Sequence, residues 1–309
     1  MSGPLRRDEV VDEPRGDDGA GPVVEITPSR ESEVGGQRVR RALPRRARRT
    51  VGPWCFADHI GPGDVDERHP FDVGPHPHIG LQTVTWLLSG ELLHRDSLGS
   101  EQLIRPGQLN LMTAGHGVSH AEEGTGFRGT VHGIQLWVAQ PESTRHGEPE
   151  FEHHASLPCQ ELGSGTATVL VGTLGDVGAP GRQDTESIGV DLDLRAGRAN
   201  VPLSTAHEHA VVVLSGGVDV DGQAVGPGQL GYLGRGRDEL VLGVADHARL
   251  LLLGGVPFES PIVMWWNFVA RSTAEIDEAR LDWGREGARF GTTGSPLDRI
   301  PAPPTPWQG

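Results

Sequence analysis

The stretch GPHPHIGLQTVTWLLSG, residues 74–90, places two histidines two positions apart in front of an apolar run rich in strand-forming residues. On a β-strand, side chains at positions i and i+2 point to the same face. We therefore expect His76 and His78 to lie side by side. The same alternation, continued to Trp86, predicts one face that is polar near the histidines and apolar farther along, as in a site that opens into a core.

The composition of the 309-residue chain favours many short strands. It holds 45 glycines and 24 prolines, with only 5% aromatic residues, which suits tight turns between strands better than a helical bundle. Runs with strand periodicity alternate with turn signals over residues 50–140, and a second set follows over residues 166–256. The predicted fold class is all-β, in two units.

The two sets of strands contain an internal repeat. Both TWLLSGELLHRDSLGSEQLIRPGQLNLM, residues 85–112, and VVVLSGGVDVDGQAVGPGQLGYL, residues 211–233, have the pattern strand, LSG turn, hairpin, PGQL turn, strand. Two homologous β modules in tandem explain this repeat better than chance does.

The two ends of the chain depart from the strand pattern. Residues 1–22 are acidic, glycine-rich and nearly free of large apolar side chains, which is typical of a disordered tail. Near the other end, Ser272 and Glu275 form a capping box, and apolar residues at helical spacing predict a helix from about Thr273 to Glu286. The remainder of the C-terminus is proline-rich and irregular.

Charge and hydropathy narrow the class of partner. A net charge of −15 disfavours direct nucleic-acid binding. No apolar run approaches the roughly 18 residues of a membrane helix, and the N-terminus lacks the apolar core of a secretory signal. A cytoplasmic protein without a membrane partner is expected, and Cys55 and Cys159 are expected to be buried thiols.

The segment RVRRALPRRARR, residues 38–49, is a local exception to the acidic charge, since seven of its twelve positions are arginine. Such a run could steer an anionic partner. The alternative is that these arginines line the solvent face of an edge strand and its turn, where charge hinders pairing with other chains. We favour the second interpretation.

A second pair of ligand-type side chains occurs in TAGHGVSHAEEG, residues 113–124, where His120 and Glu122 are again two positions apart. If an antiparallel barrel brings this strand beside the one that carries His76 and His78, four ligands converge in its interior. A single pair of this kind would more often have a structural role than bind a metal. Two such pairs, each at strand spacing, make metal binding the favoured interpretation. Three imidazoles and one carboxylate suit a divalent first-row metal, with Fe(II) as the leading candidate and Mn, Co, Ni, Cu and Zn compatible.

A similar pair, His207 and His209, lies in the second unit. The segment GYLGRGRDEL, residues 231–240, which should carry the other half of a site, contains no histidine. Two imidazoles alone make a weak metal site. We interpret the pair as polar residues at the start of a strand and expect the second unit to be free of metal.

Several segments together resemble the pirin family of bicupin proteins: FADHIGP (56–62), HPHIGLQTVTWLLSGELLHRDS (76–97), PGQLNLMTAGHGVSHAEE (106–123), HGIQLWVAQPE (132–142) and SPIVMWWNFV (260–269). The resemblance spans about residues 23–291. It implies two tandem cupin barrels with a short C-terminal helix, and a metal, usually iron, held by His76, His78, His120 and Glu122. The implied division is a tail over 1–22, a metal-binding cupin over 23–155, a metal-free cupin over 156–270, and the helix and irregular tail over 271–309.

The resemblance implies two functions of different classes. Some pirins cleave flavonols such as quercetin with O2, in a 2,3-dioxygenation that releases carbon monoxide, and Glu122 would then be the catalytic base for the flavonol 3-hydroxyl proton. Other pirins regulate transcription factors or metabolic enzymes, and iron would then control a surface that binds a protein partner. We expect the enzyme, acting as a monomer on a flavonol-like aromatic molecule and O2, and keep the regulator as the alternative.

Overall fold

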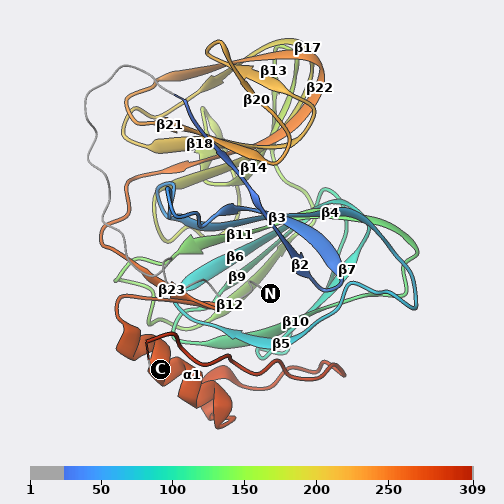
Figure 1. Cartoon of the computed structure of the whole chain (residues 1–309), viewed down its shortest axis with the longest axis vertical. Helices are drawn as coiled ribbons and strands as arrows, with labels where there is room; N and C mark the ends of the chain where they lie inside the picture. Colours follow the sequence, from blue (N-terminus) through green and yellow to red (C-terminus); the bar gives the residue numbers. More distant parts are fainter. Residues whose placement is uncertain (1–23, 308–309) are drawn as a thin grey trace.

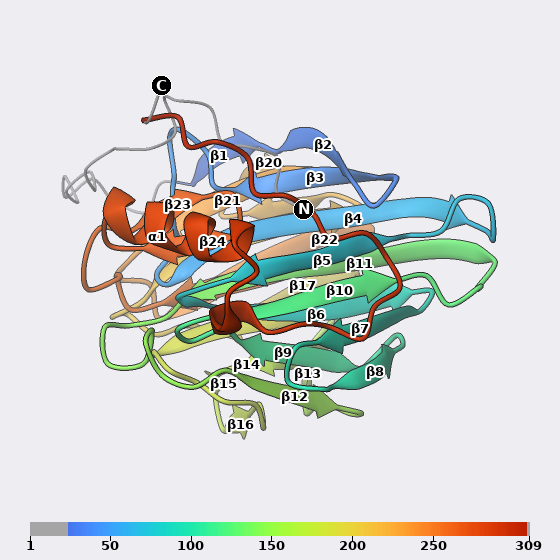
Figure 2. The same ribbon diagram turned by 90° about the horizontal axis from the view of Figure 1, so that it is seen from below.

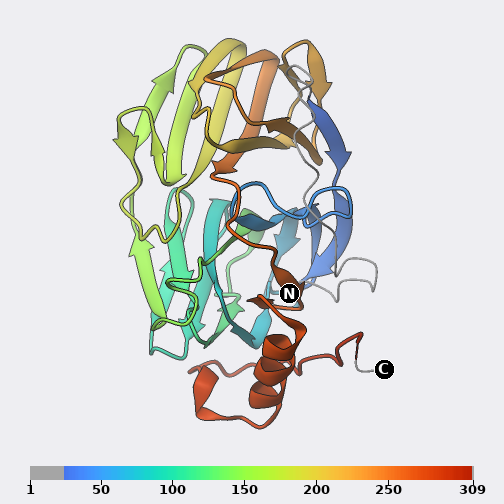
Figure 3. The same cartoon turned by 90° about the vertical axis from the view of Figure 1, so that its left-hand side faces the viewer.

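The computed structural model describes residues 24–307, which form two β units stacked along the long axis of the molecule, as Figure 1 shows. Among the described residues the one α-helix, α1 (Thr273–Gly284), lies below the lower unit (Figure 3). The all-β class and the short C-terminal helix are confirmed. The tail predicted over residues 1–22 lies outside the described residues.

The first unit consists of two sheets that face each other. One sheet has the strand order β12 (Glu150–His154), β9 (Leu109–Thr113), β6 (Leu81–Ser89), β11 (Gly129–Ala139), β4 (Trp54–Val65), β3 (Gln37–Leu43) and β2 (Arg30–Val34). The other has the order β5 (Val73–His78), β10 (Val118–Glu123), β7 (Leu92–Asp96) and β8 (Glu101–Ile104).

The second unit is built on one strongly bent sheet. Its order is β1 (Glu25–Pro28), β21 (Gln229–Gly234), β18 (Glu208–Ser215), β22 (Glu239–Gly255), β17 (Ser187–Pro202), β14 (Gly165–Val171) and β13 (Cys159–Leu162), with β19 (Val218–Val220) and β20 (Gln223–Val225) attached through β22. Two short pairs complete the described strands: β15 (Thr173–Leu174) with β16 (Val177–Gly178), and β23 (Val263–Trp265) with β24 (Phe268–Ala270). Among the described strands no sheet closes on itself, so each unit is an open form of the predicted barrel.

The repeated turns occupy equivalent places in the two units. The LSG turn follows β6 in the first unit and β18 in the second, and the PGQL turn precedes β9 and β21, respectively. The capping box at α1 is also present, since the Ser272 side chain accepts a hydrogen bond from the Glu275 backbone N–H. Cys159, which was expected to be buried, is exposed because it begins β13 at the sheet edge, whereas Cys55 is buried. Within the described range, no helix is long and apolar enough to cross a membrane.

Each unit receives a segment from the far end of the chain. Strand β1 pairs with β21, so the first described strand of the chain extends the sheet of the second unit. In the other direction, the C-terminal segment returns to the first unit, where Phe268 forms a bridge with Ile79 and the Ile300 N–H donates to the Pro75 carbonyl at 2.9 Å. Figure 2 shows α1 and the following segment running across the face that carries β5 and β10.

The expected single face from His76 to Trp86 is wrong. Gly80, with φ +66°, separates β5 from β6, and the two strands belong to different sheets. A Cβ atom at Gly80 would lie 2.2 Å from the backbone oxygen of Val269, so the turn needs glycine for space as well as conformation. Trp86 points to the second unit and donates from Nε1 to Asp191 Oδ2 at 3.0 Å.

The arginine run does not form an edge strand. Strand β3, which carries its first half, lies between β2 and β4, and β2 is the edge. Arg38 pairs with Glu31 of that edge. Arg41 is buried and binds both carboxylate oxygens of Asp58 at 2.7 and 2.6 Å. At least two of the seven arginines in this run are therefore paired with carboxylates of the same chain.

Candidate metal centre

Three of the predicted ligands meet because β5 and β10 are antiparallel neighbours. The register places His120 opposite His76 and Val118 opposite His78. One ligand atom of each imidazole lies within 4.8 Å of the others, and the ring centroids are 4.4 to 5.0 Å apart. The three side chains are almost completely buried. The prediction that these two strands lie side by side is confirmed.

The Nδ1 atoms of two of the histidines are bound to backbone carbonyls. His76 Nδ1 lies 2.9 Å from the Gly74 oxygen, and His78 Nδ1 lies 3.2 Å from the Asn267 oxygen. A carbonyl oxygen only accepts hydrogen bonds, so each Nδ1 carries the proton. The Nε2 atom of each ring is then left with a lone pair that can bind a metal.

His120 also carries its proton on Nδ1, and this depends on two further side chains, Asp96 and His94. Asp96 Oδ2 lies 3.1 Å from His94 Nε2, and Asp96 Oδ1 accepts the backbone N–H groups of Leu98 and Ser100. The carboxylate therefore holds the proton on His94 Nε2, and His94 Nδ1 becomes an acceptor. It lies 3.3 Å from His120 Nδ1. This contact places the His120 proton on Nδ1 and leaves Nε2 facing the other two histidines.

The cluster fits a cation. The Nε2 atoms of His78 and His120 lie 3.0 Å apart, and the contacts above give both of them lone pairs rather than protons. Burial lowers the pKa of His76 to about 3 and, with the neighbouring imidazoles, holds the pKa values of His78 and His120 well below the ordinary value. Neutral imidazoles are the form that binds metals, and three of them suit a divalent first-row ion.

Glu122 lies beside the cluster rather than within it. A register shift between His120 and Glu122 places Glu122 opposite Val73. The carboxylate is not part of the group of atoms that lie within 4.8 Å of one another, but it lines the same cavity as the three histidines. Burial raises the pKa of Glu122, which makes it more basic than an exposed carboxylate.

The cavity in front of the histidines, hereafter the metal chamber, is small and partly aromatic. Its volume is about 30 Å³. Trp137 stacks on Phe56 with ring centroids 4.0 Å apart, and its ring meets that of His78 edge to face. Asp58 also lines the chamber, with its charge paired to Arg41.

Gln135 lines the chamber and accepts a hydrogen bond from Thr85 at 2.9 Å, whereas Gln82 lies outside it and donates to Thr113. His59 lies next to Asp58 on β4, and its Nε2 contacts His132 Nε2 at 2.6 Å. In the second unit, His207 Nε2 lies 2.8 Å from the Glu186 carboxylate, at the start of β18.

The sequence interpretation missed the residues that orient the ligands. His94 and Asp96 have the same i, i+2 spacing as the two ligand pairs, so the pattern that identified the ligands could have identified them as well. The carbonyl of Asn267 had no such signal, because backbone atoms carry no sequence information. Asn267 also lies 189 residues after His78 in the chain.

Two stacked jelly-roll units, one with a buried three-histidine cluster, define a bicupin protein. The family model for pirin matches residues 36–138, and the model for the pirin C-terminal cupin domain matches residues 189–291. The chain belongs to the pirin family.

Relatives and solved structures agree with this assignment. A Pseudomonas aeruginosa protein named "Putative quercetin 2,3-dioxygenase" is 46% identical over 284 residues, covering 91% of this chain and 90% of the relative. A crystal structure of quercetin 2,3-dioxygenase from Acinetobacter baumannii is 42% identical, has a TM-score of 0.89, and covers 92% of this chain and 96% of that one. A bacterial pirin from Escherichia coli in complex with nickel(II) shares the fold, at 16% identity and a TM-score of 0.62, over 76% of this chain and 100% of that one.

Proposed function

We propose that this chain is a metal-dependent dioxygenase that cleaves a flavonol such as quercetin with O2. The observation that carries the proposal is the convergence of three buried, unprotonated Nε2 atoms beside a chamber with an aromatic wall. The relatives named as quercetin 2,3-dioxygenases, which match this chain over nine-tenths of its length, support the reaction class.

The proposed metal ligands are His76, His78 and His120, with Glu122 as the fourth. Fe(II) is the leading candidate for the metal, the nickel complex of the E. coli pirin supports Ni(II), and Mn, Co, Cu and Zn suit the same donors. When bound, any of these ions would supply Lewis acidity toward the flavonol 3-hydroxyl group, and Fe(II), unlike Zn(II), would also supply redox chemistry toward O2.

The chain itself supplies the base and the dry surroundings. Glu122 is proposed to accept the 3-hydroxyl proton, since it is buried, lines the metal chamber and is not engaged by an arginine in the contacts of the described residues. Trp137 and Phe56 form an apolar wall that limits water beside the three histidines.

The test is to load the purified chain anaerobically with Fe(II), add quercetin and air, and follow the loss of flavonol absorbance together with release of carbon monoxide. Turnover should be lost in His76→Ala and in Glu122→Gln. His207→Ala, which removes a histidine of the second unit, is the matched control and should retain turnover. A protein that binds one metal ion per chain yet turns over quercetin with none of the six metals would refute the proposal.

The regulator is the alternative function. The arginine run was the surface that could have bound an anionic partner, but Arg41 is buried against Asp58 and Arg48 is paired with Glu25 at 2.8 Å. This internal pairing leaves less free positive charge for a partner, so the geometry favours the enzyme.

A further inference from the structure

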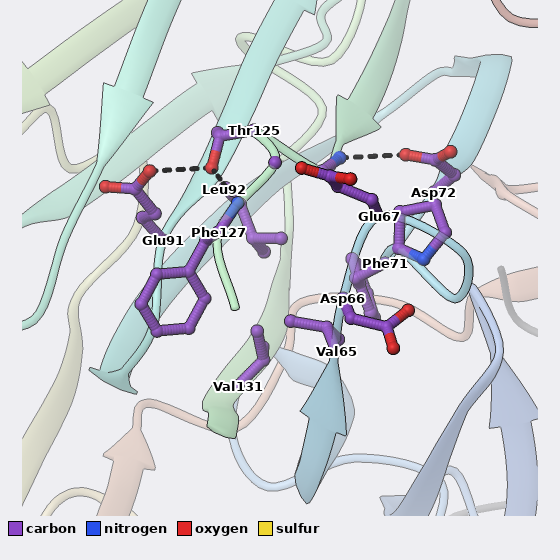
Figure 4. Close-up of a pocket in the computed structure, with 13 residues that line it drawn as sticks. Val65, Asp66, Glu67, Phe71, Asp72, Glu91, Leu92, Thr125, Phe127 and Val131 are labelled. Carbon is purple, nitrogen blue, oxygen red and sulfur yellow. Dashed lines mark hydrogen bonds between the residues drawn. The ribbon is translucent and has the colours of Figure 1, made fainter. Parts of the chain in front are cut away.

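A second, larger cavity lies at one end of the first unit, and we call it the mouth cavity (Figure 4). Its volume is about 230 Å³. Apolar side chains, among them Phe71, Leu92 and Phe127, form its walls, and the carboxylates of Asp72 and Glu91 lie among its lining groups. The cavity therefore combines apolar walls with hydrogen-bond acceptors.

The metal chamber alone is too small for an aromatic substrate. A water molecule needs at least about 10–15 Å³ of such volume, so the 30 Å³ of the chamber holds about two waters or one O2 molecule. A three-ring flavonol is several times larger. Most of a flavonol that reaches the metal must therefore lie in a neighbouring space.

Phe71 borders both cavities. Among the described residues it is the one that lines both. It lies between β4 and β5 in a segment without strand structure, and its ring packs against Gly35 in the turn between β2 and β3, where a Cβ atom would lie 3.2 Å from the ring. The two cavities therefore approach each other at this one side chain.

We propose that the mouth cavity is the subsite for the part of the substrate that does not reach the metal, and that Phe71 determines which aromatic molecules pass between the two spaces. This inference rests on the proposed function and names its substrate class as uncharged polyphenols. The apolar walls accept the ring, and the carboxylates accept hydrogen bonds from ring hydroxyl groups.

The carboxylates at the mouth cavity remain able to accept such bonds. Glu91 Oε1 accepts from Thr125 Oγ1 at 2.6 Å, and Asp72 Oδ1 accepts from the Gly124 N–H at 2.8 Å. Each carboxylate has about four acceptor positions. The arginine beside Glu91, Arg105, is well exposed at 58% and lies 3.2 Å away, so water screens its charge. A negatively charged aromatic molecule should bind less well than an uncharged one.

The first experiment fills the mouth cavity without touching Phe71 or the metal ligands. Thr125→Phe places a ring in the cavity, and Thr130→Phe is the matched control, because Thr130 also donates to a carboxylate, Asp64 at 2.8 Å, but does not line the cavity. Binding of quercetin to the Zn(II)-loaded chain, measured by tryptophan fluorescence quenching, should weaken at least tenfold in Thr125→Phe and less than twofold in Thr130→Phe. Equal affinity of the two variants would overturn the inference.

The second experiment tests Phe71 directly. Phe71→Leu, which keeps an apolar side chain in the core, should speed quercetin association at least fivefold in stopped-flow measurements while leaving azide binding to the Co(II)-loaded chain unchanged. An unchanged quercetin association rate would overturn the role of Phe71. If quercetin binds in the mouth cavity but no metal supports its turnover, the proposed function alone is refuted. If Thr125→Phe turns over quercetin with an unchanged KM, this inference alone is refuted.

Discussion

Replacing His94 by phenylalanine should weaken metal binding although His94 is not proposed as a ligand. In the native chain, His94 Nδ1 accepts the proton of His120 Nδ1 at 3.3 Å, and this contact leaves His120 Nε2 free for a metal. Phenylalanine keeps the ring that stacks on Phe151, where the centroids are 4.4 Å apart. The change therefore removes the orienting contact with little change in packing.

The size of the expected loss of metal affinity follows from how His120 responds when the contact with His94 is lost. Its Nδ1–H would be buried without an acceptor, at a cost of about 1–3 kcal/mol. The ring can avoid that cost by moving its proton to Nε2, where His78 Nε2 lies 3.0 Å away and can accept it. Metal binding must then reverse this shift. We expect metal affinity to fall about 10- to 100-fold, which is the usual effect of losing such a partner.

The assay is a competition titration of Zn(II) or Ni(II) against a chelator of known affinity, with folding checked by thermal denaturation. Phe151→Leu is the control, because it removes the stacking partner but keeps the contact between His94 and His120. It should lower thermal stability and leave metal affinity within about twofold of the native value. Affinity of His94→Phe within twofold of native would refute the reasoning.

Three further predictions concern stability. Burial lowers the pKa of His59 to about 3, so between about pH 6.5 and pH 3 the unfolded chain binds a proton that the folded chain does not, and stability falls as pH falls. Between pH 7 and pH 5 the free energy of unfolding of the metal-free chain should fall by about 2 kcal/mol less in His59→Asn than in the native chain, as measured by urea denaturation. An equal fall in the two chains would contradict this. Arg41→Met should lower the free energy of unfolding by about 3–5 kcal/mol, because it leaves the buried Asp58 carboxylate without its partner. The double variant with Asp58→Leu should regain most of that free energy in the same assay. Gly80→Ala, which meets a backbone oxygen at 2.2 Å, should lower the melting temperature more than Gly107→Ala, where φ is also positive but the space is open, and equal losses would show that conformation alone matters.

The sequence predicted those parts of the molecule that depend on local alternation. The i, i+2 spacing predicted that His76 and His78 lie together, the expected pairing of their strand with that of His120 is confirmed, and the turn motifs predicted two repeated β units. The same rule failed at Gly80, because one residue with positive φ redirects the chain into another sheet. It also missed that β3 lies inside its sheet, because β2, which pairs with β3 across the turn at Gly35 and Gly36, was not recognised as a strand.

The predicted domain boundaries and the role of Glu122 stay predictions. The exchange of terminal segments between units shows why boundaries are hard to infer from sequence. Residues 25–28 are adjacent in sequence to the first unit but pair with β21 of the second, and this backbone pairing joins residues more than 200 positions apart, as in Glu25 with Tyr232. Local patterns contain no information on it.

The contact between His78 and the Asn267 carbonyl also has a consequence for the newborn chain. During translation, His76, His78 and His120 leave the ribosome long before residue 267 is made. Until then His78 lacks the acceptor that fixes its proton, so the histidine cluster cannot reach its final arrangement before synthesis of the chain is nearly finished.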